Sequence, residues 1–158
     1  MDPKGEYRLP ASRQAVWEAL NDPETLRECI PGCESLERQE DGRMTALVVA
    51  KVGPVKAKFN GEVRLEDVVA PESYSIVGEG KGGIAGFAKG GAHVHLAEDG
   101  DHTVLTYTVE AQVGGKIAQL GGRLIDSTAK KRSGQFFDCL AAKVSGGTAS
   151  VEEITAPA

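Results

Sequence analysis

A glycine-rich segment carries the pattern closest to a cofactor motif. Gly78, Gly80 and Gly83 fit G-x-G-x-x-G, the fingerprint of dinucleotide-binding sites. That motif works when a helix begins after the last glycine, because the helix N-terminus binds the pyrophosphate. Residues 84–88 lead instead into another strand-like segment. We therefore interpret the segment as a hairpin in which glycines permit bulges and strong sheet curvature.

Two histidines are candidate metal ligands. His93 and His95 share one face of a predicted strand, a spacing compatible with a shared metal ion. Val94 and Leu96 take the opposite parity, which we interpret as the inward one, so both imidazoles should face solvent. We favour a structural or inert role for the pair. No G-x-S-x-G elbow and no recognisable partner motif supports nucleophilic catalysis.

The three cysteines, Cys29, Cys33 and Cys139, cannot all pair, and three in this chain do not make a disulfide framework. Cys29 and Cys33 flank the turn signal Pro31-Gly32 and lack the two-residue spacing of usual zinc ribbons. Because Cys139 is distant in the sequence, we interpret the cysteines as buried or turn residues, with a redox or metal role as the alternative. This usage predicts a reducing compartment.

Charged residues offer little catalytic chemistry. Glu62 and Glu66 lie on the polar face of a predicted strand, where they should be solvated. Lys130, Lys131 and Arg132 form a short basic run in a predicted helix. We interpret the run as a solvent face, with contact to an acidic partner surface or to lipid headgroups as the alternative.

Composition excludes several classes of protein. The 158 residues fit one domain with a short tail, and 41% are apolar, enough for a core. Eighteen Lys and Arg against 23 Asp and Glu give a net charge of −5, which disfavours binding to nucleic acid. The N-terminus has no apolar signal core and no run could span a membrane, so we expect a cytoplasmic protein with at most peripheral membrane contact. Glycine is frequent, at 20 residues, whereas aromatic residues are few.

The periodicity of apolar residues predicts the elements that position these side chains. Residues 4–10 read as a short strand, followed by helices at 13–20, after the N-cap Ser12, and at 23–29. From residue 33 to residue 113 the period is two, and turn signals divide the segment into an antiparallel meander. Leu105, Tyr107, Val109 and Ala111 illustrate the inward parity.

The C-terminal part returns to helical spacing. Residues 117–144 predict one long amphipathic helix, with Gly121, Gly122 and Gly134 as points where it could fray or kink. Residues 145–158 are small and polar and read as a mobile tail, which leaves one domain at 1–144. The fold class is therefore α+β, with a curved antiparallel sheet wrapped around the last helix.

This layout resembles the START-like, helix-grip superfamily, and local strings narrow the resemblance. The strings are GEYRL at 5–9, VWEALNDPE at 16–24, CIPGCESL at 29–36, VGPVKAKFNG at 52–61 and GGKIAQLG at 114–121. Together they resemble the CoxG family of carbon monoxide dehydrogenase over about residues 4–144.

The resemblance implies an accessory protein of a molybdenum hydroxylase system of the CO dehydrogenase type, and not its catalytic component. Family members are associated with maturation of the dehydrogenase, with holding it at the membrane, and with binding a quinone between sheet and helix. Relatives often carry a longer C-terminal extension linked to membrane attachment. This chain ends soon after its predicted helix, which argues against direct anchoring.

The sequence feature that best indicates a function is a predicted cavity inside the fold. Small inward residues, Ala57, Gly61, Gly90 and Ala92, should leave space between a bent sheet and the helix, where a small apolar ligand could bind. The candidate lining residues are the large side chains on these faces, with plain core packing as the alternative for each: Trp17, Phe59, Tyr74, Phe87, Tyr107, Leu120, Leu124 and Phe136.

We expect a non-enzymatic carrier or chaperone without a covalently bound cofactor, which binds a quinone or another lipid and docks on the hydroxylase. The hydroxyls of Tyr74 and Tyr107 suit the carbonyl groups of a quinone. Two alternatives stay open. One is an interaction module for cofactor insertion with an incidental cavity, and the other is an enzyme acting on a hydrophobic substrate.

Overall fold

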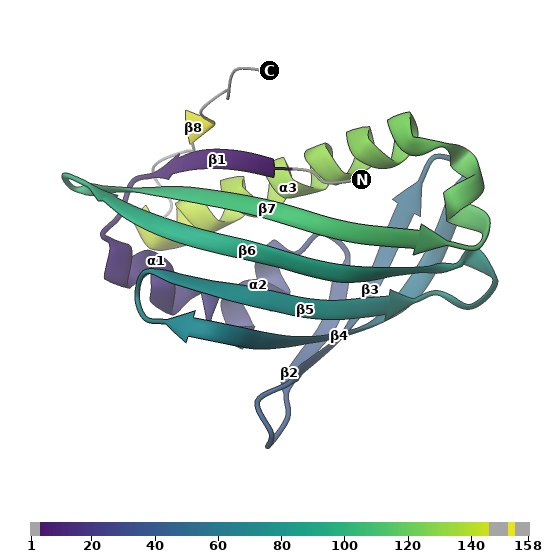
Figure 1. Ribbon diagram of the computed structural model, residues 1–158, viewed down its shortest axis with the longest axis horizontal. Coiled ribbons are helices and arrows are strands. Elements are labelled where there is room, and N and C mark those ends of the chain that lie inside the picture. Colours follow the sequence, from purple (N-terminus) through teal and green to yellow (C-terminus); the bar gives the residue numbers. More distant parts are fainter. Residues whose placement is uncertain (1–3, 146–151, 154–158) are drawn as a thin grey trace.

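The chain forms an antiparallel sheet that curves around one long helix (Figure 1). The computed structural model describes residues 4–145 and 152–153. The elements, in chain order, are β1 (Lys4–Leu9), α1 (Arg13–Leu20), α2 (Pro23–Cys29), β2 (Cys33–Arg38), β3 (Met44–Val52), β4 (Val55–Val69), β5 (Ser73–Lys81), the 3₁₀ turn η1 (Gly83–Ala85), β6 (Phe87–Asp99), β7 (His102–Gly114), the 3₁₀ helix η2 (Lys116–Leu120), α3 (Gly122–Ser145) and β8 (Glu152–Glu153). The predicted α+β, helix-grip layout is confirmed.

The strand order is β2-β3-β4-β5-β6-β7-β1-β8, and every neighbouring pair is antiparallel. Strands β2 to β7 follow each other as the predicted meander. β1 joins at the far side of β7, where Tyr7 pairs with Leu105. The three longest strands, β4, β6 and β7, have 15, 13 and 13 residues, and their length lets the sheet arch over the helices.

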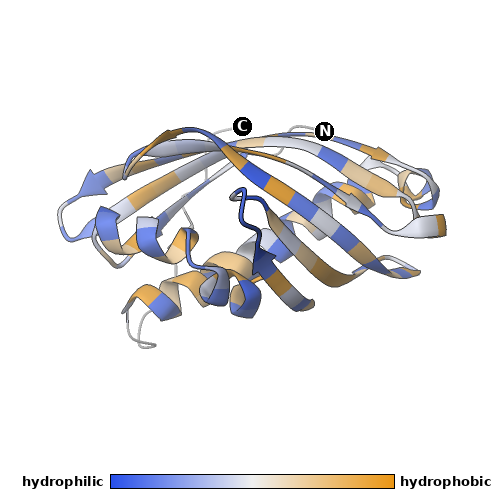
Figure 2. Cartoon of the chain, turned by 90° about the horizontal axis from the view of Figure 1, so that it is seen from below, coloured by the Kyte–Doolittle hydropathy of each residue, from blue (hydrophilic) through white to orange (hydrophobic). Residues whose placement is uncertain are grey.

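The faces of the sheet follow the predicted period of two. In β4, Ala57 and Phe59 are half-buried, whereas Lys56 and Lys58 are exposed. The same alternation of hydrophobic and hydrophilic residues runs along the strands in Figure 2, where the helices lie on the concave side of the arch. The sheet therefore has one face toward the helices and one toward solvent.

Local signals set the two short helices. The Ser12 hydroxyl accepts a hydrogen bond from the Ala15 backbone N–H at 3.2 Å and so caps α1. The Asp22 carboxylate caps α2 by accepting from the Glu24 backbone N–H, and Pro23 occupies the first helical position. Both helices have the predicted bounds.

The prediction of one continuous helix over 117–144 is wrong. The segment divides into η2 and a 24-residue α3, with Gly121 between them at φ +94°. A right-handed helix cannot include that backbone conformation, and glycine adopts it without steric cost. Gly122 and Gly134 lie inside α3, so only Gly121 interrupts the helical backbone.

The main cluster of buried hydrophobic residues lies where α1 and the C-terminal half of α3 meet β1, β6 and β7. Thr103 is fully buried there, and its hydroxyl donates to the Ala11 carbonyl oxygen at 2.8 Å, which satisfies the polar group. The largest fully buried hydrophobic side chains are Leu9, Leu96, Leu105, Leu140 and Val16. Toward the middle of the sheet this packing gives way to the cavity described below.

The interpretation of the cysteines as unpaired is wrong for two of the three. Cys29 at the end of α2 and Cys139 in α3 form a disulfide, with their Cα atoms 5.2 Å apart across 110 residues of sequence. The two helices bring the thiols within bridging distance, which the sequence separation concealed. Cys33 is free and half-buried, and burial raises the pKa of its thiol.

The C-terminal segment is described in part. The predicted mobile tail, 145–158, lies mostly outside the described residues, and the domain boundary at 144 stays a prediction. Glu152 and Glu153 form β8, which pairs with Arg8 and Tyr7 of β1. None of the described helices combines the length and the apolar character that crossing a bilayer requires.

Candidate ligand-binding cavity

A cavity of about 430 Å³ lies between the concave face of the sheet and helices α2 and α3. This volume is within the range of small-molecule sites, roughly 300–1,000 Å³. Its walls come from nearly every element of the domain. The lining residues are Leu20, Leu26, Ile30, Leu36, Met44, Ala46, Val48, Gly61, Val63, Leu65, Tyr74, Ile76, Ala92, Val94, Leu105, Tyr107, Val109, Ser133, Phe136 and Phe137.

The lining is almost entirely apolar. The lining residues with a hydroxyl group are Tyr74, Tyr107 and Ser133, and no carboxylate, imidazole, amine or thiol of the described residues belongs to it. A polar cavity would hold ordered water, whereas an apolar one stays dry and binds apolar molecules. The arrangement can therefore enclose a hydrophobic ligand and donate a few neutral hydrogen bonds to it.

Small residues on the sheet leave this space open. Gly61 and Ala92 line the cavity, as expected from their inward parity, and Ala46 on β3 adds to them. Ala57 and Gly90, which were expected beside them, do not line it. Large residues at the three lining positions would fill the space between sheet and α3.

Tyr74 lines the cavity and carries a hydroxyl group. The side chain is buried, and its ring meets the indole of Trp17 edge-on. Burial raises the pKa of Tyr74, so the phenol stays protonated and can donate a hydrogen bond. Within residues 4–145 the hydroxyl has no hydrogen-bond partner, which leaves it for a ligand acceptor.

Tyr107 presents its ring to the cavity. The ring stacks near Phe137 at a centroid distance of 5.7 Å, with the planes 18° apart, and Tyr7 lies on the same stack. Gly5 on the adjacent strand makes room, because a Cβ there would lie 2.7 Å from the Tyr107 hydroxyl oxygen. That hydroxyl therefore lies over β1, and the aromatic face forms the wall.

The structure brings three of the eight predicted lining residues to the cavity: Tyr74, Tyr107 and Phe136. Contact between these three and a ligand stays a prediction. The other five do not line it, and they are Trp17, Phe59, Phe87, Leu120 and Leu124.

Several of those five residues have packing roles elsewhere. Trp17 stands behind Tyr74. The ring of Phe59 covers Gly82, and the ring of Phe87 covers Gly114, in each case where a Cβ would collide with the ring. Correct inward parity on a long strand is thus insufficient, because the cavity occupies only the middle of each strand.

One wall of the cavity was missed from the sequence. This wall contains Leu26 of α2 and Ile30, which caps that helix. It also contains Leu36 of β2 and Met44 of β3. The spacing of four between Leu26 and Ile30 was an available signal, because it places both on one helix face. Which face of α2 meets the sheet depends on how the helix docks.

Three connections hold α2 against α3 beside this wall. The first is the disulfide between Cys29 and Cys139. The second is an ion pair between Lys143 and Glu28. In the third, the Arg132 guanidinium donates to the Pro31 carbonyl oxygen at 2.7 Å, and burial lowers the pKa of Arg132. Arg132 is thus half-buried, which departs from the solvent-face interpretation of the basic run.

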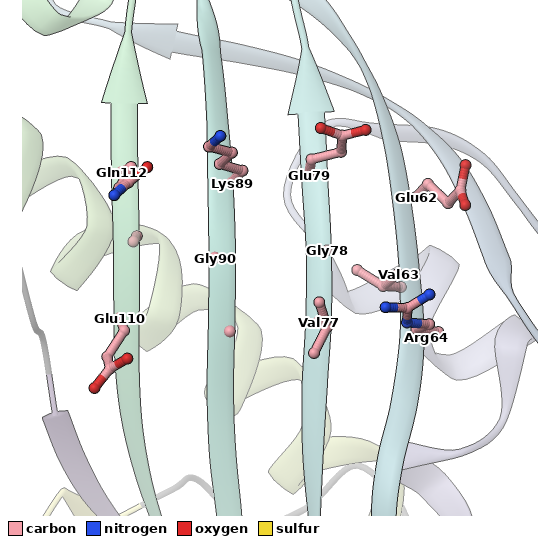
Figure 3. A pocket seen from close by; sticks show the side chains of 12 residues that line it. Glu62, Val63, Arg64, Val77, Gly78, Glu79, Lys89, Gly90, Glu110 and Gln112 are labelled. Atoms are coloured by element: carbon pink, nitrogen blue, oxygen red, sulfur yellow. The ribbon is translucent and has the colours of Figure 1, made fainter.

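A larger space of about 760 Å³ lies on the convex face of the sheet, with the helices behind the strands (Figure 3). Exposed charged side chains surround it, among them Glu62, Glu79, Lys89 and Glu110. Gly90 and Gly91 contribute bare backbone. Apolar side chains make up only part of this lining, whereas the cavity on the concave face is almost entirely apolar and is the better candidate for a hydrophobic ligand.

The glycine motif lies in a hairpin, as interpreted. Gly83 begins the three-residue turn η1, which is followed by β6, so the helix that a dinucleotide site requires is not at this position. His93 is exposed and its Nδ1 lies 3.2 Å from the Ser75 hydroxyl, whereas His95 Nε2 lies 3.6 Å from a Glu72 carboxylate oxygen. Among the described residues, no three His, Cys, Asp or Glu side chains come together as a metal site.

A curved antiparallel sheet that holds a C-terminal helix over an apolar cavity is the START-like fold. A START superfamily protein from Mycobacterium smegmatis superposes with a TM-score of 0.69 at 16% identity, over 93% of this chain and 99% of that one. The Zhui aromatase/cyclase from a Streptomyces species has a TM-score of 0.64 at 12% identity, over 92% and 93% of the two chains. These two likenesses establish the fold alone.

The sequence comparison is more specific. A conserved protein from Geobacillus kaustophilus is 31% identical, with a TM-score of 0.88 over 92% of this chain and 96% of that one. The family model for the CoxG subunit of carbon monoxide dehydrogenase matches residues 5–145. The chain belongs to the CoxG family. No curated protein sequence matches it.

Proposed function

We propose that this protein is a non-enzymatic accessory protein of a molybdenum hydroxylase of the CO dehydrogenase type. It binds a quinone or another hydrophobic molecule in the cavity and docks on the dehydrogenase for maturation, recruitment or delivery of an electron acceptor. The site of action is the cytoplasm, with peripheral contact at the inner face of the membrane, because a quinone carrier must exchange its ligand with the bilayer.

The observation that carries this proposal is the chemistry of the cavity lining in a CoxG family member. Apolar side chains surround the space, and the only groups of the described residues there that can titrate are the phenols of Tyr74 and Tyr107. General acid–base catalysis needs a group whose pKa lies near the working pH, and burial moves the pKa of Tyr74 upward, away from it. Such a lining supports ligand binding and offers no group for acid–base catalysis.

A quinone headgroup matches this lining in shape and polarity. Its ring and isoprenoid chain are apolar and suit the walls, and its carbonyl oxygens accept hydrogen bonds. The Tyr74 hydroxyl can donate one of these bonds, because Tyr74 lines the cavity and its phenol stays protonated. The ring of Tyr107 offers a flat surface for stacking.

Ligand binding is tested with the purified full chain. Organic extraction followed by mass spectrometry should reveal a bound quinone or lipid, and titration with menaquinone and ubiquinone should give saturable binding. Ala92→Phe, which fills the floor of the cavity, should abolish binding. Ala97→Phe makes the same change on the opposite parity of β6, away from the lining, and should bind as the wild type does.

Two results would count against the carrier function. One is a chain that yields no ligand on extraction and shows no affinity for either quinone. The other is equal binding by Ala92→Phe and by wild type. Docking is measured separately by pull-down of the dehydrogenase, which Ala92→Phe should still capture, because the substitution changes only the interior.

A further inference from the structure

One end of the molecule gathers most of its positive charge. The connections between β3 and β4, between β5 and β6, and between β7 and α3 lie within residues 48–61, 80–91 and 111–137. These segments hold ten of the 18 Lys and Arg residues but one of the 23 Asp and Glu residues. We call them the basic end, and their cations are Lys51, Lys56, Lys58, Lys81, Lys89, Lys116, Arg123, Lys130, Lys131 and Arg132. Since the chain carries −5 overall, the remaining residues are strongly acidic.

The topology brings these segments together. In an antiparallel meander every second connection lies at the same end, and Figure 1 shows the three connections there, beside the start of α3. The Leu124 side chain of α3 lies directly over Gly53 of the β3–β4 turn. Lys58 and Lys81 are paired with Glu34 and Glu79, whereas the other eight cations of the basic end have no ion-pair partner among the described residues.

A basic groove of about 520 Å³ opens on this end between β3 and α3. Lys51, Lys56, Lys131 and Arg132 line it, together with neutral residues, and no carboxylate of the described residues belongs to the lining. Within the described part of the chain, Lys51, Lys56 and Lys131 have no ion-pair partner. Cations gathered around a groove without acidic partners favour an anionic ligand, because each otherwise repels its neighbours.

An apolar side chain projects from the same end. Ile84 in η1 is 93% exposed, the largest exposed fraction of any large hydrophobic residue described, and the nearby Phe87 is 40% exposed. The backbone holds this turn in place where Gly86 crosses Gly115 of the β7–η2 connection. A Cβ on Gly86 would lie 2.1 Å from the Gly114 carbonyl oxygen, so the two connections pack backbone to backbone.

From this combination we propose that the basic end docks on an anionic lipid bilayer. Ile84 inserts among the headgroups and upper acyl chains, and the groove between β3 and α3 binds lipid phosphate groups. A single apolar side chain on a turn enters a fluid interface without a preformed pocket, and surrounding cations add electrostatic attraction to anionic lipids. This inference rests on the proposed function in one respect, which is that a quinone carrier must visit a membrane.

Sedimentation with vesicles tests this docking. The full chain should bind vesicles of phosphatidylcholine mixed with phosphatidylglycerol, bind phosphatidylcholine alone weakly, and dissociate in high salt. Ile84→Ser should lower partitioning about tenfold, given the transfer free energy of an isoleucine side chain. Lys51→Gln with Lys131→Gln should lower it further, at roughly fivefold for each lysine.

Matched controls separate this surface from general effects. Val68→Ser removes an apolar side chain that is 51% exposed on the last part of β4, away from the basic end, and should leave partitioning unchanged. Arg27→Gln with Arg64→Gln removes two cations that form ion pairs with Glu24 and Glu66, and should have little effect. Equal binding to neutral and anionic vesicles, or equal losses in test and control variants, would overturn the proposal.

The test also distinguishes docking from ligand binding. Ile84→Ser should bind a short-chain quinone in solution as the wild type does, whereas Ala92→Phe should keep its affinity for vesicles. If the wild type ignores vesicles but binds quinone, the docking proposal fails alone. If it binds vesicles but no quinone, the proposed function fails and the docking surface stands.

Discussion

The indole ring of Trp17 meets the ring of Tyr74 edge-on, with the two ring centroids 5.3 Å apart. Tyr74 lines the cavity, so the single tryptophan of the chain stands one side chain behind the cavity wall. Trp17 is therefore a spectroscopic probe for the interior, placed close to a ligand but outside the lining.

Quinone binding should quench the fluorescence of Trp17, because a quinone is a good electron acceptor and would lie close to the indole. A titration of the wild type with menaquinone should give saturable quenching. Ala92→Phe should show only the linear quenching of free quinone in solution. Saturable quenching of equal depth in Ala92→Phe would place the quinone outside the cavity.

The hydroxyl of Tyr74 should contribute measurably to affinity. Tyr74→Phe keeps the ring against Trp17 but removes the donor, so quinone affinity should fall about threefold to tenfold, the range for one neutral hydrogen bond. Isothermal titration measures this. An unchanged affinity would mean that the ligand carbonyls find another donor, for which Ser133 is the remaining candidate on α3.

Stability at high pH should also depend on Tyr74. Its pKa is raised by burial, whereas a tyrosine in the unfolded chain titrates at about 10. Below pH of about 10 both states are protonated and the contribution to stability is fully present. As the pH rises further, the unfolded chain loses the proton first, so stability falls by at most about 1.4 kcal/mol per pH unit.

Urea unfolding at a series of pH values measures this dependence. The stability of Tyr74→Phe should decline less steeply above pH of about 10 than that of the wild type, while the difference between them stays constant at lower pH. Parallel curves over the whole range would contradict the assignment of this slope to Tyr74.

The disulfide between Cys29 and Cys139 should stabilise the domain. It closes a long loop, with 110 residues of separation, so Cys29→Ser with Cys139→Ser should lower the free energy of unfolding by about 2–5 kcal/mol. Cys33→Ser is the control, because Cys33 is free. A reductant should lower the Tm of the wild type and leave that of the double variant unchanged. Equal Tm values for both with and without reductant would refute the stabilising role.

Arg132 should matter for the contact between α3 and the turn after α2. Arg132→Met removes the hydrogen bond to the Pro31 carbonyl oxygen while keeping much of the apolar stem, and should cost about 1–2 kcal/mol. Lys131→Met, on the exposed neighbour, should change stability by less than about 0.5 kcal/mol. Chemical unfolding compares the two, and equal effects would show that the contact contributes nothing specific.

Much of the fold could be predicted from local sequence signals. The bounds of α1 and α2 follow from Ser12, Asp22 and Pro23, because capping and proline geometry act within one helical turn. The alternating burial of β4 follows from its strict period of two. The order of elements then limits the topology, since successive strands joined by short turns pair as neighbours.

The candidate site could be predicted only in part. Parity identified Tyr74 and Tyr107, which line the cavity, but it also selected Phe59 and Phe87, which share the pattern and lie elsewhere. Parity says which face a side chain takes. It does not say how far along the strand the helix covers that face.

Local patterns along the chain were therefore sufficient for most of the elements, for their faces and for the family. Three features emerged only from the folded arrangement: the wall that α2 adds to the cavity, the disulfide between Cys29 and Cys139, and the basic end around Ile84. The physical reason is common to all three. Each depends on the distance between segments far apart in the chain, and that distance is set by how helices dock on a curved sheet, not by local conformational preference.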